Sequence, residues 1–415
     1  MRFLITNGLQ PEALDAPQIL RDFIDEMARG LRGDGALPML PAGFLLRHCA
    51  PKNCTVPAFD VGGTNLRSAR VAFDASGNVR FDNLLRGGMP GAQKPVDTAT
   101  FYQELCEVIA PNLRDGERFG FCFSYPVTDE GKLLFWTKKI QAPDIPGRNV
   151  GADLLNALTL RGHFDISLQI LNDTVAALLA AYARPDAAGA AGQVGFILGT
   201  GTNTAYAEAT EQILKCQPLP PRKLMPINCE SGNFTRFPKS TFDLQYEAAS
   251  GNGKAQWERC ISGVHLGSLG TILLRQAAQE GLLPSLTDRL NAHTFTHIEL
   301  DNYCAGTNPN LFNCPSNEAE TLRTLLTTLY ERAALFAAIN IAAAGIRSAR
   351  ARNQTSGTIH VNADGSTFWK TTSIPFAQRV AGHLETLLHP YHYTCTLFRV
   401  EEAPLLGAAL AALNR

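Results

Sequence analysis

Two segments of the chain share one pattern, and this repeat limits the fold more than any other feature. The first, residues 56–73, is an apolar strand, the turn GGTN at 62–65 and a second strand. The second, residues 194–208, is an apolar strand, the turn GTGTN at 199–203 and another strand. Both segments predict β-hairpins with glycine-rich tips. The same hairpin pattern thus occurs twice, about 137 positions apart, which indicates an internal duplication.

Helical and strand patterns alternate along the rest of the chain. Helical periodicity predicts helices at 11–33, 98–110, 174–183, 254–279, 318–349 and 405–413. Short apolar runs predict strands at 119–125, 168–171, 358–361 and 393–400. This alternation indicates a layered α/β architecture in each half. The loop 183–192 is rich in Ala, Gly and Pro, so it is the expected domain boundary.

Composition narrows the class of protein. A net charge of −1 leaves no whole-chain basic field, so we expect no nucleic-acid partner. The ten cysteines include no C-x-x-C pair, which disfavours a zinc site and favours reduced thiols. We find no apolar run of 18 residues and no secretory leader, and therefore expect a cytoplasmic protein without membrane insertion. Monomer and homodimer both stay open.

The first hairpin carries groups that suit a phosphate and a divalent cation. Glycine lets backbone N–H groups approach an anion, and a neighbouring carboxylate can hold a cation directly or through water. The candidate residues are Asp60, Gly62, Gly63, Thr64, Asn65 and Arg67. Taken alone, GGTN is equally a plain tight turn. The second tip, with Thr200, Gly201 and Thr202, favours two tips that grip one polyphosphate.

Several acids and one lysine are candidates for the chemistry on the acceptor. Asp173 lies where an apolar strand meets a helix, so it is either a helix cap or the base of a phosphoryl transfer. Glu230 and Glu258 are either surface acids or ligands of vicinal sugar hydroxyls. Lys138 follows Trp136 and Thr137, in either a basic loop or a sugar contact near the migrating phosphate.

In order and spacing, these motifs resemble the eukaryotic-type hexokinases, a family that includes the mammalian glucokinases. The similar segments are 26–31 (EMARGL), 37–41 (LPMLP), 59–67 (FDVGGTNLR), 121–126 (FCFSYP), 136–138 (WTK), 171–175 (LNDTV), 199–206 (GTGTNTAY), 228–230 (NCE), 257–263 (WERCISG), 363–366 (ADGS) and 407–410 (GAAL). The family has the two-lobed actin-like ATPase (ribonuclease H-like) fold, an α/β fold with duplicated domains around a central cleft. The resemblance therefore implies this fold and transfer of the γ-phosphoryl group of ATP to the 6-hydroxyl of glucose or a similar hexose.

The resemblance also implies roles for particular residues. Asp173 would be the general base, with Lys138 and Arg67 assisting catalysis. The hexose would be bound by Ser124, Thr137, Lys138, Asn172, Asp173, Asn203, Glu230 and Glu258. ATP would be bound by Asp60, Gly62, Gly63, Thr64, Asn65, Arg67, Thr200, Gly201, Thr202 and Gly407, with Asp60 on Mg²⁺. The implied large lobe comprises 1–55 and 186–404, the small lobe 56–185, and the helix 405–415 returns to the small lobe. The lobes of the family close on sugar, which excludes water.

Two departures from the family pattern keep alternatives open. Residues 231–234 are SGNF where the family usually has Trp-Gly-Ala-Phe. Residues 402–406 are EAPLL where it has a Gly-Ser-Gly run against the adenosine, and Pro404 has no N–H to donate. One alternative is a hexose-binding sensor or regulator with weak turnover. The other is a hexose kinase with a different phosphoryl donor.

Overall fold

A computed structural model describes residues 2–46, 51–63, 65–127, 131–136, 139–251 and 253–414. It divides into two compact units. The large unit comprises Met1–Leu40, Ala190–Arg222 and Ile227–Arg399. The small unit comprises Pro41–Gly189, Lys223–Pro226 and Val400–Arg415, and it thus contains the C-terminal helix.

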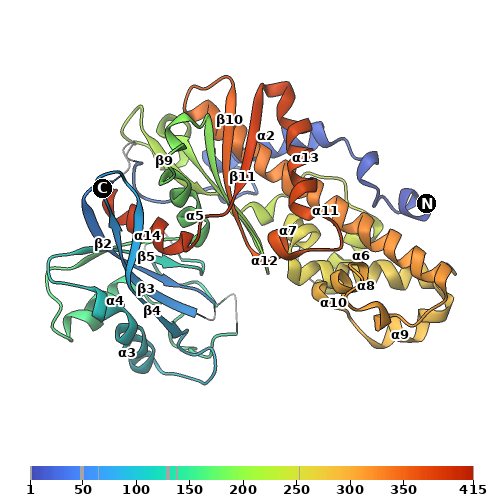
Figure 1. Ribbon diagram of the computed structural model, residues 1–415, viewed down its shortest axis with the longest axis horizontal. Helices are drawn as coiled ribbons and strands as arrows, with labels where there is room; N and C mark the ends of the chain where they lie inside the picture. Colours follow the sequence, from blue (N-terminus) through green and yellow to red (C-terminus); the bar gives the residue numbers. More distant parts are fainter. Residues whose placement is uncertain are drawn as a thin grey trace. The chain divides into compact units, whose positions relative to one another are not determined.

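The two sheets repeat one strand order, which confirms the predicted duplication (Figure 1). The small unit has β4 (Val79–Gly88), β3 (Asn65–Phe73), β2 (Cys54–Val61), β5 (Arg118–Phe123) and β6 (Ser167–Leu171), in that order. The other sheet has β1 (Leu40–Pro41), β9 (Leu224–Asn228), β8 (Thr202–Ala209), β7 (Gly192–Leu198), β10 (Gly357–Asp364) and β11 (Tyr393–Phe398). In each sheet the central strand pairs antiparallel with its hairpin partner and parallel with the strand on its other side.

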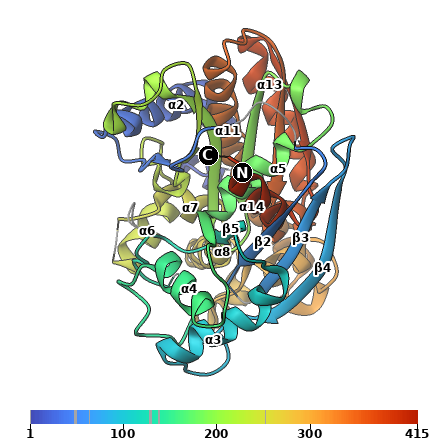
Figure 2. The same ribbon diagram turned by 90° about the vertical axis from the view of Figure 1, so that its left-hand side faces the viewer.

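Helices cover both faces of the small sheet. The aromatic side chains of Phe119 and Phe121 pack into a core with α3 (Thr98–Ile109) and α4 (Val150–Thr159). Because side chains alternate along a strand, Gly120 faces the opposite side. There α14 (Ala403–Leu413) lies so close that a Cβ at position 120 would meet the backbone oxygen of Ala408 at 1.8 Å. Figure 2 shows α3 and α4 beside the strands β2, β3 and β4.

The long helix α11 (Ser316–Ala351) is the central support of the large unit, packed against β7 and β8. Its flanking helices are α2 (Ala16–Arg32) and α13 (Phe376–Leu388). The remaining helices are α1 (Arg2–Thr6), α6 (Thr241–Ser250), α7 (Gln256–Ile261), α8 (Gly263–Gln279), α9 (Thr287–Ala292), α10 (His297–Cys304) and α12 (Ser366–Lys370).

Helix α11 is consistent with the prediction that no apolar run of 18 residues exists, because charged residues interrupt every 18-residue stretch of it. It contains an 18-residue window with a mean hydropathy of 1.3, which passes a membrane-span test by length and composition. However, 94% of that window is buried inside the protein, as expected for the core helix of a folded domain.

Helix boundaries differ from the predictions for local reasons. The helix expected at 11–33 begins at Ala16, because the side chain of Asp15 caps it by accepting a hydrogen bond from the N–H of Gln18. The helix expected at 254–279 is two helices, since Ser262 adopts an extended conformation between them. The elements that were not predicted are helices α1, α4, α6, α9, α10, α12 and α13 and strands β1, β4 and β9.

Candidate functional site

Three predicted site residues follow adjacent parallel strands of the small unit. Asp60 is near the end of β2, Ser124 follows β5, and Asp173 follows β6. Strands β2, β5 and β6 are neighbours and parallel, so their carboxyl ends lie at one edge of the sheet. Ligands of open α/β sheets bind at such edges. The fold thus brings together residues that are up to 113 positions apart (60 to 173).

Asp60 is the centre of a charged network. Its Oδ2 accepts hydrogen bonds from Nε and Nη2 of Arg67, at 2.8 and 2.5 Å. The pairing of β2 with β3 sets Asp60 opposite Arg67, which explains this contact. Nη1 of Arg67 donates to Oε2 of Glu402 at 2.7 Å, and Nη2 of Arg86 reaches Oε1 of Glu402 at 2.5 Å. Glu402 and Arg86 were not among the predicted site residues.

Burial raises the pKa of the Asp60 carboxyl above its ordinary value. The guanidinium of Arg67 opposes this shift in the pKa, while the nearby charge of Asp173 adds to it. The Asp60 carboxyl also interacts with the thiol of Cys122 on β5. The charge of Asp173 thus reaches Asp60 across the edge of the small sheet.

Asp173 is the first residue of α5 (Asp173–Tyr182), and it does not cap that helix. The cap is Asn172, whose side-chain oxygen accepts a hydrogen bond from the N–H of Thr174 at 2.8 Å. The interpretation of Asp173 as the cap is therefore wrong. Asp173 is half-buried, and its Oδ1 accepts a 3.3 Å hydrogen bond from the Thr174 hydroxyl.

A backbone hydrogen bond closes the tip of the first hairpin. The N–H of Gly62 donates to the oxygen of Asn65 at 3.0 Å. Gly62 and Gly63 are half-buried and Asn65 is exposed. Three further predicted residues, Thr64, Thr137 and Lys138, lie outside the described residues.

The large unit brings three polar side chains into one cluster. Nδ2 of Asn203 donates to Oδ1 of Asn228 at 2.6 Å, and to Oε1 of Glu230 at 3.3 Å. Nδ2 of Asn228 donates to the same oxygen of Glu230 at 2.8 Å. Asn203 and Glu230 were predicted; Asn228 was not, although it lies in the segment NCE that carried the resemblance. Glu230 has a φ of +53°, a strained value that points to a constrained position.

Glu258 connects helix α7 to the tip of the second hairpin. Its Oε2 accepts a hydrogen bond from the N–H of Thr202 at 2.8 Å. Two glycines make room for this side chain. A Cβ at Gly201 would lie 2.7 Å from Oε2, and one at Gly232 would lie 3.0 Å from Cβ of Glu258.

The second tip is anchored to the start of α8. The oxygen of Gly199 accepts hydrogen bonds from the N–H of Gly263 and the hydroxyl of Thr367, both at 2.8 Å. The Thr202 hydroxyl donates to the oxygen of Ile197 at 3.0 Å. Thr202 therefore uses both donors inside the unit, whereas Thr200 is exposed at the tip.

Gly407 is explained by packing. It is buried in α14, and a Cβ there would meet the oxygen of Ala176 in α5 at 2.1 Å. Only glycine allows these two helices to approach so closely. The nucleotide contact implied for Gly407 by the resemblance stays a prediction.

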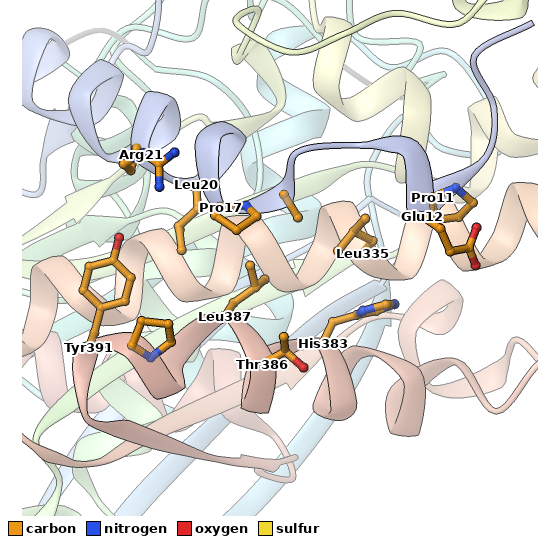
Figure 3. Close-up of a pocket in the computed structure, with 12 residues that line it drawn as sticks. Pro11, Glu12, Pro17, Leu20, Arg21, Leu335, His383, Thr386, Leu387 and Tyr391 are labelled. Carbon is orange, nitrogen blue, oxygen red and sulfur yellow. The ribbon is translucent and has the colours of Figure 1, made fainter. Parts of the chain in front are cut away.

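A cavity of about 330 Å³ in the large unit contains none of the predicted site residues (Figure 3). Figure 3 shows Pro17 and Leu20 on one side and Leu387 and Tyr391 on the other, with Leu335 of α11 between them. Its lining is mostly apolar, with Glu12, Arg21, His383 and Thr386 as polar members.

Within the described residues, no group of three or more His, Cys, Asp or Glu side chains could hold a metal ion. The Mg²⁺ expected on Asp60 would therefore be shared with bound phosphates, because proteins usually hold this cation with one or two carboxylates and the phosphates of a substrate.

Two family models match this chain, and both are described as Hexokinase. One matches residues 5–183 and the other 193–414. The chain is 29% identical to Hexokinase-2 of Candida albicans over 89% of its own length and 82% of that protein. It is 27% identical to Hexokinase-2 of Saccharomyces cerevisiae, over 95% and 87%. It is 30% identical to Hexokinase-1 of the same yeast, over 64% of its own length and only 59% of that protein.

Solved structures show the same fold. A hexokinase from Schistosoma mansoni in complex with glucose has a TM-score of 0.76 at 22% identity, covering 96% of this chain and 94% of that one. A second hexokinase crystal structure has a TM-score of 0.78 at 21% identity, covering 98% and 97%. The architecture is the two-lobed actin-like fold, and the matches support a hexokinase function. The chain belongs to the hexokinase family.

Proposed function

We propose that this chain transfers the γ-phosphoryl group of ATP to the 6-hydroxyl of glucose or a closely similar hexose. The observation that carries the proposal is the edge of the small sheet, where Asp173 lies within electrostatic range of the Asp60–Arg67 pair. A proton acceptor beside a phosphate-binding hairpin is the arrangement that phosphoryl transfer to an alcohol requires. Family membership and the hexokinase names of the relatives support the same activity.

Asp173 is the proposed general base. It accepts the proton of the sugar hydroxyl as the oxygen attacks phosphorus, and it orients that hydroxyl beforehand. The transition state is loose, so the proton leaves late and an ordinary carboxylate suffices. Asn172 holds the start of α5 and thereby fixes the backbone that carries Asp173.

Arg67 is the proposed electrostatic stabiliser of the phosphates. Its guanidinium is held by Asp60 and Glu402, so its orientation is set before the substrate binds. Such preorganisation costs no rearrangement at the moment of reaction. Lys138 is a further proposed hydrogen-bond donor, to the charge that develops on the phosphoryl group during transfer.

The large unit supplies the proposed sugar ligands Asn203, Glu230 and Glu258. Their amide and carboxylate groups match the donors and acceptors of vicinal hydroxyls. Because hydrogen bonds within the unit already orient Asn203, Glu230 and Glu258, they lose little side-chain entropy when sugar binds. Thr200 and Gly201 are the proposed phosphate contacts of the second tip.

Magnesium fits the proposed site as an ion carried by the nucleotide. Oδ2 of Asp60 is engaged by Arg67, and a carboxylate has a second oxygen for the ion or for its bound water. The bound ion would neutralise charge on the phosphates.

Cytoplasmic location also stays a proposal. It is supported by the free state of the described cysteines, which suits a reducing compartment.

One observation keeps a different phosphoryl donor as the second candidate. Pro404 occupies the first turn of α14, where it fits the helix but presents no N–H. The resemblance places an adenosine contact in this segment, so a chain with Pro404 has fewer backbone donors there. The weakly active sensor is the remaining alternative.

A matrix of initial rates over sugars and donors tests the proposal. Purified chain is given glucose, fructose, mannose or galactose with ATP, GTP, ADP or polyphosphate, and sugar phosphate is measured directly. We expect the highest rate with ATP and one of the first three hexoses. Micromolar sugar binding without turnover for any donor would support the sensor instead, and a high rate with only a non-ATP donor would support the second candidate.

A further inference from the structure

We propose that His265 and Tyr246 position Glu258 for hexose binding. This inference rests on the proposed function, because Glu258 is one of the proposed sugar ligands. It adds to that function two residues that lie outside every motif on which the family resemblance was based. His265 is the third residue of α8, and Tyr246 belongs to α6.

The three side chains form a row. Nε2 of His265 lies 3.7 Å from Oε1 of Glu258. On the other side of the imidazole, Nδ1 lies 2.7 Å from the hydroxyl oxygen of Tyr246. The side chains of His265 and Glu258 are 23% and 25% exposed, so the row is shielded from most water but still open to a ligand.

The order of acceptors determines where the imidazole carries its proton. Glu258 is an acceptor when ionised, so Nε2 must carry the hydrogen that faces it. In the neutral ring Nδ1 is then an acceptor, and the Tyr246 hydroxyl donates to it. Tyr246 thereby selects the tautomer that directs an N–H at Glu258.

The separation of 3.7 Å exceeds a direct hydrogen bond. The imidazole therefore acts on the carboxylate through its N–H dipole. On the opposite side, Oε2 of Glu258 is held by the N–H of Thr202 at 2.8 Å. The two contacts restrain the carboxylate from both sides and leave it oriented before sugar binds.

Tyr246 is itself firmly placed. Its helix α6 begins with a capping box formed by Ser240 and Asp243. Asp243 is also paired with Arg332 of α11 through two hydrogen bonds, at 2.6 and 2.8 Å, in the interior. The guanidinium of Arg259 lies 5.7 Å from the centre of the Tyr246 ring. A rigid Tyr246 can hold the imidazole, whereas a mobile one could not.

The test separates positioning from packing. His265→Phe keeps a ring of similar shape and removes both nitrogens, so we expect the KM for glucose to rise about tenfold. The kcat and the KM for ATP should stay within about twofold, because Oε2 of Glu258 keeps its hydrogen bond to the N–H of Thr202 and the second tip stays in place. His265→Gln retains an amide donor and should recover part of the loss. Tyr246→Phe should raise the KM about threefold, since only the orienting hydroxyl is lost.

His383→Phe is the matched control, because His383 is a half-buried histidine on α13 outside the proposed site. The proposal is overturned if His265→Phe and Tyr246→Phe retain the wild-type KM, or if His383→Phe raises it equally. If the wild-type chain phosphorylates no hexose, the proposed function fails, and calorimetric hexose binding by the same variants still decides the role of His265. A variant that lowers the melting temperature without changing the KM also counts against positioning.

Discussion

The β2–β3 hairpin of the small unit and the β7–β8 hairpin of the large unit share a topology and a glycine-rich tip, but different interactions hold them. In the first hairpin, the second residue pair counted from the tip is Asp60 opposite Arg67, which form an ion pair. The corresponding pair in the second hairpin is Ile197 opposite Asn203, which carries no charge. A backbone hydrogen bond closes each tip, but the first hairpin is also held by the ion pair of Asp60 and Arg67, and the second by hydrogen bonds from its backbone to α8 and to the carboxylate of Glu258.

This difference fits a division of the proposed chemistry between the duplicated halves. In the proposed function, the charged first hairpin contacts the phosphates, and the charge of Asp173, the proposed base, acts on its Asp60. The second hairpin carries neutral donors, and Asn203 and Glu258 connect it to the proposed sugar ligands. Changes in the first hairpin should therefore lower kcat, and changes in the second hairpin that displace Asn203 or Glu258 should raise the KM for hexose.

The largest effect should follow loss of the base. Asp173→Ala should lower kcat by about 10²- to 10⁴-fold, because the carboxylate acts in the transition state. Its hexose affinity should change much less. Glu230→Ala is the comparison variant, for which the KM should rise by about 10- to 100-fold. Steady-state rates and calorimetric sugar binding measure both; near-normal turnover of Asp173→Ala would contradict the role of this residue.

Loss of Arg67 should have the next largest effect. Arg67→Met should lower kcat/KM for ATP by about 10²- to 10³-fold, the usual cost of one preorganised donor. Arg67 also holds down the pKa of the Asp60 carboxyl, so its removal raises that pKa further. Protonated Asp60 would then persist to higher pH, and the acid limb of the rate profile should move to higher pH. An unchanged acid limb would exclude Asp60 as the group that sets it.

A smaller effect should distinguish the two tips directly. Gly201→Ala places a Cβ 2.7 Å from Oε2 of Glu258, so the carboxylate must move. We expect the KM for hexose to rise about tenfold, with little change in melting temperature, because the far end of a flexible side chain can yield. Gly62→Ala is the matched change in the first tip, where the Cβ would lie 3.3 Å from the oxygen of Asn65. It should leave the hexose KM unaltered, and equal effects on that KM would remove the distinction between the tips.

The smallest effect should follow loss of Arg86. Its side chain is 58% exposed, and its partner Glu402 remains bound to Arg67. Solvent screens such a pair, so Arg86→Ala should change kcat/KM for ATP less than about threefold. Glu402→Ala should have the larger effect, since it releases Arg67 as well. The kcat/KM for ATP of both variants is measured at low and high salt. A larger loss of kcat/KM in Arg86→Ala than in Glu402→Ala would place the critical contact at Arg86.

Motif spacing was sufficient to predict the candidate residues that lie next to a glycine tip or a strand end, such as Asp60 and Asp173. Local chemistry dominates there, since a turn needs glycine and a strand end presents a side chain. Asn228 was missed because an amide in an apolar strand has no local signal. Its partner Asn203 is 25 residues away and meets it only after the sheet has formed. The same holds for Glu402, which reaches Arg67 across 335 positions.

The duplicated hairpins, the alternation of helices and strands, and the identity of the acids follow from the order of amino acids alone, because these depend on period, turn residues and side-chain type. The pairing of the acids, the residue that caps α5 and the side chains proposed to orient Glu258 became known from the folded structure. Those properties depend on contacts between residues that are distant in the chain. Such contacts exist only when burial of the two sheets and their helices holds the segments together.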